Sequence, residues 1–137
     1  MNTFTKTIDL LHRALSANTV ERSVIANNIA NANVPNFKRS MVNFESELKR
    51  ALDTEKNKPA LELAQTHPDH FSNYKERDYR DVQIRRVLDH SSAYNNNGNN
   101  VDPEQEFMLA TINQMTYNLL VQSASFEFSQ VNQILRN

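Results

Sequence analysis

Residues 26 to 39 read Ala-Asn-Asn-Ile-Ala-Asn-Ala-Asn-Val-Pro-Asn-Phe-Lys-Arg, and in this stretch a helical pattern runs into a proline turn. Asn27 and Asn31 are one helical turn apart, so their side chains share a face and can hydrogen-bond each other, a facing helix or backbone. Pro35 pushes the residue before it towards extended geometry. A helix is therefore predicted to end near Ala32.

The four residues 34–37 have the chemistry of a type II turn. Pro35 suits the second position, and Asn36 tolerates the positive φ that the third position needs. Asn33 is expected to be left-handed just past the helix end. Lys38 and Arg39 are expected to follow on an exposed strand or loop, and two basic residues are too few to indicate nucleic-acid binding.

The segment before this turn has the spacing of a coiled-coil helix. Asn18 and Arg22 occupy the middle of its seam, where they either select a particular partner or register, or are rotated out to solvent. The sequence leaves both alternatives open. The seam alternates spacings of four and three through Phe4, Ile8, Leu11, Leu15, Asn18, Arg22, Ile25 and Ile29.

A second long helix is predicted after residue 101. Asp102 can cap it, Pro103 fits its first position, and Glu104 and Glu106 suit the positive end of its dipole. Its seam runs through Met108, Ile112, Met115, Leu119, Gln122 and Phe126.

The two long helices are predicted to form an antiparallel coiled-coil pair that also packs against copies of the same or related chains. Asn27, Asn28 and Asn31 would fix its register. In this pairing Leu11, Leu15, Ile25 and Ile29 face Ile112, Met115, Leu119 and Phe126.

The sequence between the two helices is less regular. It predicts a short amphipathic helix over 42–52, a polar linker over 53–59, a strand within 79–88 and a flexible asparagine-rich loop over 91–100. Leu61 and Leu63 can form a short extended piece. The predicted fold is mainly α: a single domain over 1–137 with an N-terminal helix (1–32), a loop-rich middle that can hold short strands (33–101) and a C-terminal helix (102–137).

Composition narrows the class of protein. A chain of 137 residues with 39% hydrophobic residues is long enough for one domain. Its net charge of -1 gives no general attraction to nucleic acid or to an anionic membrane, and the absence of cysteine excludes disulfides. Asp9, Arg13 and Glu21 interrupt the first 25 residues, so these are predicted to be neither a cleavable signal peptide nor a membrane span.

No motif predicts catalysis. The sequence has no serine-centred nucleophile elbow, no glycine-rich phosphate loop and no evident pair of catalytic carboxylates, so neither an enzymatic activity nor a cofactor is expected. His67 and His70 could begin a metal site. Pro68 stands between them and no third or fourth ligand has convincing spacing, so a metal site is not predicted.

Two segments resemble the flagellar axial proteins, and among them the short proximal-rod proteins of the basal body. The first is 26–38, and the second is Asn-Asn-Val-Asp at 99–102. The chain departs from the family pattern at Val34 and Asn36, where threonine and glycine are usual, and at Pro103, where an apolar residue is usual. Asparagine can adopt the glycine conformation at a modest cost, so the turn is expected to survive.

The resemblance implies a structural rod subunit that transmits torque. It implies export without a cleavable signal by the flagellar type III apparatus, and a place in the periplasmic part of the basal body. Partners would be copies of the chain, other rod proteins, the basal-body adaptor protein and the MS ring, with no nucleic acid. Assembly residues would include Pro35, Asn36 and Phe37 together with the helix residues named above. The alternative is a helical adaptor or export chaperone that does not polymerise.

Overall fold

The computed structural model describes residues 3–57, 77–90 and 96–136, and these are mainly α-helical. The chain divides into two compact units, one formed by residues 1–42 with 86–137 and the other by residues 43–85. The first unit holds the two long helices. In its described residues, the second holds a short helix and a 3-10 turn.

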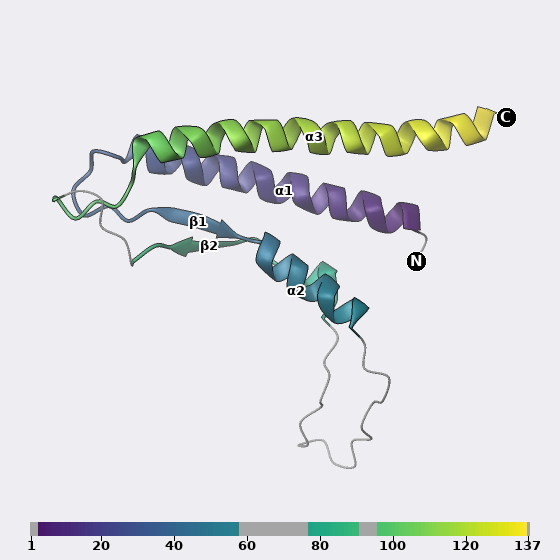
Figure 1. The fold of residues 1–137 in the computed structure, drawn as a ribbon, viewed down its shortest axis with the longest axis horizontal. Helices are drawn as coiled ribbons and strands as arrows, with labels where there is room; N and C mark the ends of the chain where they lie inside the picture. The colour runs from purple at the N-terminus through teal and green to yellow at the C-terminus, as the bar shows by residue number, and fades with distance from the viewer. Residues whose placement is uncertain (1–2, 58–76, 91–95, 137) are drawn as a thin grey trace, which may run out of the picture. The chain divides into compact units, whose positions relative to one another are not determined.

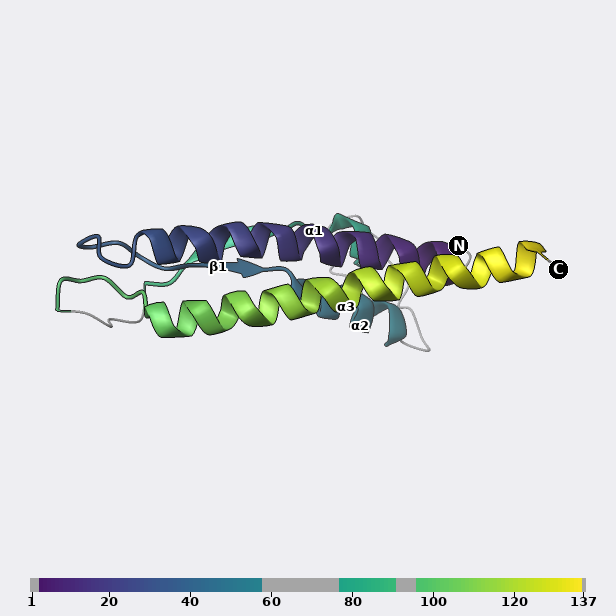
Figure 2. The same ribbon diagram turned by 90° about the horizontal axis from the view of Figure 1, so that it is seen from above.

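The long helices α1 (Thr3–Ala30) and α3 (Pro103–Arg136) lie side by side and antiparallel, with both chain ends at the same end of the pair (Figures 1 and 2). The prediction of two long, paired terminal helices is confirmed. The rings of Phe4 and Phe128 meet edge to face, with centroids 6.1 Å apart. Asp102 caps α3 as predicted, because its Oδ1 accepts hydrogen bonds from the N–H groups of Glu104 and Gln105.

The turn after α1 follows the prediction in one respect and departs from it in another. The Phe37 N–H donates to Val34 O at 3.3 Å, and Asn36 has a φ of 60°, as the predicted type II turn requires. Asn33 was predicted to be left-handed, which is wrong: among the described residues, Asn36 is the one non-glycine residue with positive φ. The helix itself ends at Ala30 and passes into tighter turns, with Ala32 N–H bonded to Ile29 O.

The face that α3 turns towards α1 differs from the predicted seam. The predicted residues Ile112, Met115, Leu119 and Phe126 have exposed fractions between 50% and 63%, so their predicted pairing with α1 is wrong for the single chain. At Ala110, Asn113 and Ala124 the inner face lies two positions before Ile112, Met115 and Phe126, whereas Tyr117, two positions before Leu119, is exposed. From Glu106 onward, the buried and half-buried residues of α3 are Glu106, Leu109, Ala110, Asn113, Thr116, Leu120, Ala124, Glu127 and Val131.

The sequence left open whether Asn18 and Arg22 on the α1 seam face a partner or solvent, and each alternative applies to one of them. Asn18 is buried against α3, whereas Arg22 is exposed. Ile25 is buried, and Leu11 and Leu15 are half-buried. Hydrophobic periodicity therefore predicted which face of α1 is buried, but it predicted the wrong face for α3.

Two short strands, β1 (Ser40–Asn43) and β2 (Arg85–Leu88), pair antiparallel (Figure 1). The predicted strand within 79–88 is thus only β2, because Tyr79–Asp81 form a 3-10 turn (η1). The Asp89 N–H donates to Arg39 O at 2.8 Å and extends the pairing by one residue. Arg39 was expected to be exposed, yet only 14% of its side chain is.

The second unit is built on α2 (Glu45–Lys56), whose start and end both differ from the prediction. It begins later than residue 42, because β1 occupies the preceding residues, and it runs into the segment predicted as a linker. Among the described residues of this unit, the buried apolar side chains are Phe44, Ala51 and Tyr79. The Arg77 N–H reaches Thr54 Oγ1 at 3.2 Å, which ties the segment around η1 to α2.

Several predictions fall outside the described residues: the extended piece at Leu61 and Leu63, the pair His67 and His70, and loop residues 91–95. Loop residues 96–100 are described, and Asn99 and Asn100 are buried rather than part of a flexible loop. In the described part of the chain, no helix has the length and apolarity to cross a membrane. The same residues contain no group of three His, Asp or Glu side chains placed to hold a metal ion.

Candidate assembly surface

The outward side of α3 carries five large apolar side chains at heptad-like spacing, which we call the apolar stripe. Each is at least half exposed. A coiled-coil seam has this spacing when it packs against another helix. Within this chain α1 contacts another face of α3, so the stripe is left uncovered. Its members are Met108, Ile112, Met115, Leu119 and Phe126.

Behind the stripe, a reciprocal pair of asparagines joins α1 to α3. Asn18 Nδ2 donates to Asn113 O at 3.2 Å, and Asn113 Nδ2 donates to Asn18 O at 3.1 Å. Asn113 Nδ2 also lies 3.0 Å from a carboxylate oxygen of Glu21. The asparagines are both buried, so each amide replaces water with the backbone of the opposite helix.

A second polar contact lies nearer the start of α3, around Glu106. This side chain is fully buried (0% exposed) and forms an ion pair with Arg39. Asn28 Nδ2 donates to Glu106 Oε2 at 3.2 Å. The Asn28 amide also bonds both backbone groups of Ser40, with its Nδ2 2.8 Å from Ser40 O and its Oδ1 3.0 Å from Ser40 N. Asn28 therefore joins α1, α3 and β1.

Asn99 supports the end of α1. Its Nδ2 lies within 3.0 Å of three backbone oxygens, those of Asn31, Ala32 and Val34, and its Oδ1 accepts from the Val101 N–H at 2.7 Å. These carbonyls lie at and just beyond the helix end, where intrahelical partners run out. Asn99 is fully buried, so its amide takes the place of water there.

Gly98, the single glycine of the chain, lies against the turn that Asn36 occupies. It has a φ of 78°, and a Cβ atom at this position would lie 2.7 Å from Asn36 Oδ1. The Asn36 N–H donates to Asn97 O at 3.1 Å, and Lys38 Nζ donates to Gly98 O at 2.8 Å. The positive φ and the close contact both favour glycine here.

The structure brings some of the predicted assembly residues together and separates others. Asn27 and Asn31 bond each other as predicted, with Asn31 Nδ2 2.6 Å from Asn27 Oδ1. The predicted assembly residues that are buried or half-buried are Leu11, Leu15, Ile25, Asn28, Ile29, Asn31 and Phe37. Those that are exposed are Asn27, Pro35, Asn36, Ile112, Met115, Leu119 and Phe126.

Sequence reasoning missed most of the polar contacts. Glu106 was interpreted as a first-turn charge, and Asn113 was not singled out. A signal was present, since Glu106, Asn113 and Leu120 repeat every seven residues, but the series of larger apolar residues Met108, Ile112, Met115, Leu119 and Phe126 gave the stronger pattern.

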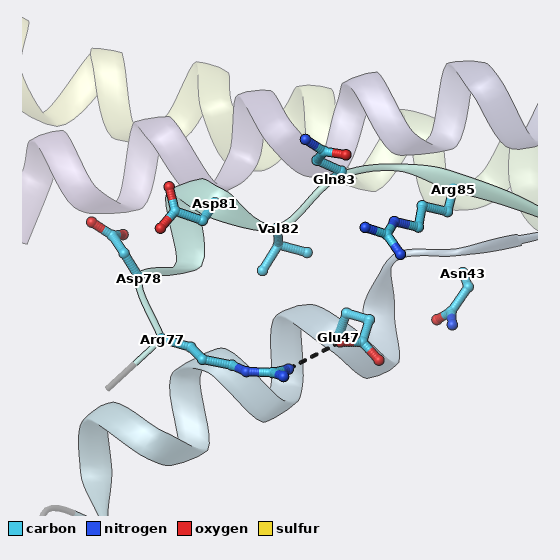
Figure 3. A pocket seen from close by; sticks show the side chains of 8 residues that line it. All are labelled: Asn43, Glu47, Arg77, Asp78, Asp81, Val82, Gln83 and Arg85. Carbon is cyan, nitrogen blue, oxygen red and sulfur yellow. Dashed lines mark hydrogen bonds and ion pairs between the residues drawn. The ribbon is translucent and has the colours of Figure 1, made fainter. Parts of the chain in front are cut away.

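The second unit contains a separate polar pocket of about 500 Å³ (Figure 3). Glu47 lines it and is already engaged, by Arg50 at 2.9 Å and by Arg77 at 3.4 Å. Asp78 caps η1 by accepting from the Arg80 N–H at 2.9 Å. These charged groups hold the segment around η1 against α2, so we assign them a structural role.

Comparison with known proteins identifies the family of the chain. Residues 8–38 match the family described as flagella basal body rod protein. The chain is 44% identical over 136 residues to "Flagellar basal body rod protein FlgB" of Borreliella burgdorferi, covering 99% of this chain and 100% of that protein. It is 33% identical over 137 residues to the protein of the same name in Bacillus subtilis, covering 98% and 97%. By this similarity over its whole length, the chain belongs to the FlgB family of flagellar basal body rod proteins.

Proposed function

We propose that this rod protein polymerises through its terminal helices, with copies of itself and with other rod proteins, and that the resulting proximal rod transmits torque. The observation that carries the proposal is the apolar stripe of α3. Soluble monomers seldom leave so many large apolar side chains in one row, and such rows mark interaction sites. The role proposed is structural rather than catalytic.

The chemistry of the two helices indicates which one makes the apolar contacts. Residues 3–30 of α1 contain no exposed large hydrophobic side chain, whereas α3 contains the whole stripe. In the proposed assembly, α3 therefore contacts α1 of its own chain on one side and a neighbouring helical subunit on the other.

The size of the stripe suits an assembly with several contacts per subunit. Burying one large apolar side chain contributes about 1.5–3 kcal/mol, so five contribute roughly 7–15 kcal/mol as an upper estimate. Bringing two proteins together costs on the order of 4–15 kcal/mol. For a single stripe contact, the free energy gained by burial is thus about equal to the cost of association. Stable polymers then need several neighbours at once, and an interface that does not close on itself extends into a helical array.

The wider setting of the proposal comes from the family resemblance. On this basis we propose that the subunit is exported by the type III apparatus and acts in the periplasmic part of the basal body, with the adaptor protein and the MS ring as partners. The exposed turn residues Pro35 and Asn36 stay in the proposal as a second contact with a neighbour.

The test is complementation of a non-motile deletion strain, made by removing this gene from a motile bacterium. Met115→Asp with Leu119→Asp places two charges on the stripe, while Ser125→Asp, also on an exposed part of α3, is the matched control. We expect the stripe variant to abolish swimming and to be absent from detergent-extracted basal bodies, and the control to behave as wild type. Immunoblots establish that all chains accumulate equally.

Two outcomes would contradict the proposal. One is normal motility with the stripe variant. The other is recovery of a tagged wild-type chain only in the cytosolic fraction with a single partner, which is the behaviour of a non-polymerising adaptor or chaperone. Several copies per purified basal body support the rod assignment.

A further inference from the structure

α3 presents two rows of residues, one to α1 and one outward, and the rows are offset by two positions. Because successive helix residues are about 100° apart, an offset of two directs the rows towards nearly opposite sides. Four of the five stripe residues follow this offset, in the pairs Glu106 and Met108, Ala110 and Ile112, Asn113 and Met115, and Ala124 and Phe126; Leu119 does not, because Tyr117 is exposed.

Over residues 106–115, hydrophobic burial alone favours the opposite rotation of α3. In this part the inner row holds Glu106, Ala110 and Asn113, whereas the outer row holds Met108, Ile112 and Met115; further along, the inner face also contains the half-buried Leu120 and Val131. Turning this part of α3 about its axis would bury the larger apolar side chains against α1. Some other interaction therefore sets the rotation that is observed.

The reciprocal contact of Asn18 and Asn113 is one such interaction. Each amide donates to the backbone oxygen of the other residue, and both side chains are buried. Residues near them on the two helices are small: Ala17 is buried and Ala110 is half-buried. If α3 turned, Asn18 would face apolar side chains with no acceptor for its amide, which is costly for a buried polar group.

Glu106 supplies the second interaction. In the observed rotation its carboxylate meets Arg39 and the amide of Asn28. Turning α3 would remove both partners at once, and Arg39 would lose the carboxylate that neutralises it. Separating the members of a buried ion pair costs more than removing a neutral hydrogen bond.

We propose that these two contacts fix the rotation of α3 about its own axis and thereby keep the apolar stripe facing outward. The polar residues then act as a specificity device: they exclude the helix packing that would hide the stripe within the same chain. The use of the stripe in assembly rests on the proposed function. The rotation itself is a property of the single chain.

The absence of cysteine allows a direct test by thiol labelling of the purified full-length chain. Single reporters are introduced at Met115→Cys, on the stripe, and at Leu120→Cys, on the half-buried inner face. With the contacts intact, the reporter at 115 reacts faster. The same two reporters are then placed in a variant chain that lacks both polar contacts, because it combines Asn18→Ala, Asn113→Ala and Glu106→Ala.

In that variant chain we expect the ratio of the two labelling rates (115 over 120) to fall tenfold or more. A tenfold change corresponds to a shift of about 1.4 kcal/mol in the balance between the two rotations. Asn113→Ala alone is expected to lower the ratio in the same direction by a smaller factor.

An unchanged ratio would overturn the proposal, because side-chain packing would then set the rotation. Labelling of both reporters at the rate of the urea-unfolded chain would overturn it too, because the polar contacts would then hold the pair together rather than choose its rotation. The labelling uses the isolated chain. A failure here is therefore distinct from a failure of the stripe variants to enter basal bodies.

Discussion

Replacing Asn99 by alanine is expected to lower the stability of the helix pair by about 3 kcal/mol. The two N–H groups of its amide serve three carbonyl oxygens at distances of 2.8 to 3.0 Å, and its Oδ1 accepts one N–H at 2.7 Å. The side chain therefore supplies the equivalent of three hydrogen bonds, each contributing about 1 kcal/mol net. For a domain of this size the expected fall in Tm is roughly 10 °C.

The assay is urea and thermal unfolding of the purified chain, followed by far-UV circular dichroism. Asn96→Ala, a few residues away at an exposed position, is the matched control and is expected to unfold as wild type. Asn99→Asp keeps the shape of the side chain but turns a carboxylate towards three carbonyl oxygens, so it is expected to lose at least as much stability as Asn99→Ala. Equal unfolding midpoints for Asn99→Ala and Asn96→Ala would refute the reasoning.

Three further predictions concern the same end of the molecule, and each is checked by the unfolding midpoint. Gly98→Ala is expected to lower the free energy of unfolding by about 1–2 kcal/mol, because it forces a residue with a side chain into positive φ and against Asn36. Adding Asn36→Gly should restore part of this stability, and no restoration would argue against the steric contact. Asn36→Val is expected to cost about 1–2 kcal/mol and Asn36→Gly close to nothing, so the reverse order would exclude a φ effect. Arg39→Ala leaves the carboxylate of Glu106 buried without its cation and is expected to cost about 3–5 kcal/mol, against little change for the exposed Arg22→Ala.

The sequence predicted the two long helices because their apolar residues recur with a helical period over many turns. It also predicted the turn at Asn36, because proline followed by asparagine restricts the φ and ψ angles to few conformations. The start of α3 at Pro103 followed from the capping residue before it. These features depend on local chemistry, and local chemistry can be read from one sequence.

The rotation of α3 could not be predicted in the same way. Ile112 and Met115 have the larger apolar side chains, so a rule based on burial assigns them to the partner helix. The structure instead buries Asn113 and Glu106, whose partners Asn18, Asn28 and Arg39 lie far away in the sequence. The seven-residue repeat of Glu106 and Asn113 was weaker than the apolar pattern, and it does not identify which distant residues are the hydrogen-bond partners.

The burial of Asn99 and Asn100 escaped prediction for a related reason. A run of asparagines contributes no apolar area and is typical of a loop. The amide of Asn99, however, can satisfy a helix end as water would, and this use depends on where the end of α1 lies in space.

The contacts of Asn18 with Asn113 and of Asn28 with Glu106 also have a mechanical consequence. They lie at two levels of the helix pair, roughly 10–15 Å apart at 1.5 Å of rise per residue. A force that slides one helix along the other stretches both contacts together, whereas a force that peels the helices apart breaks them one after the other. The helix pair is therefore expected to resist shear much more strongly than peeling.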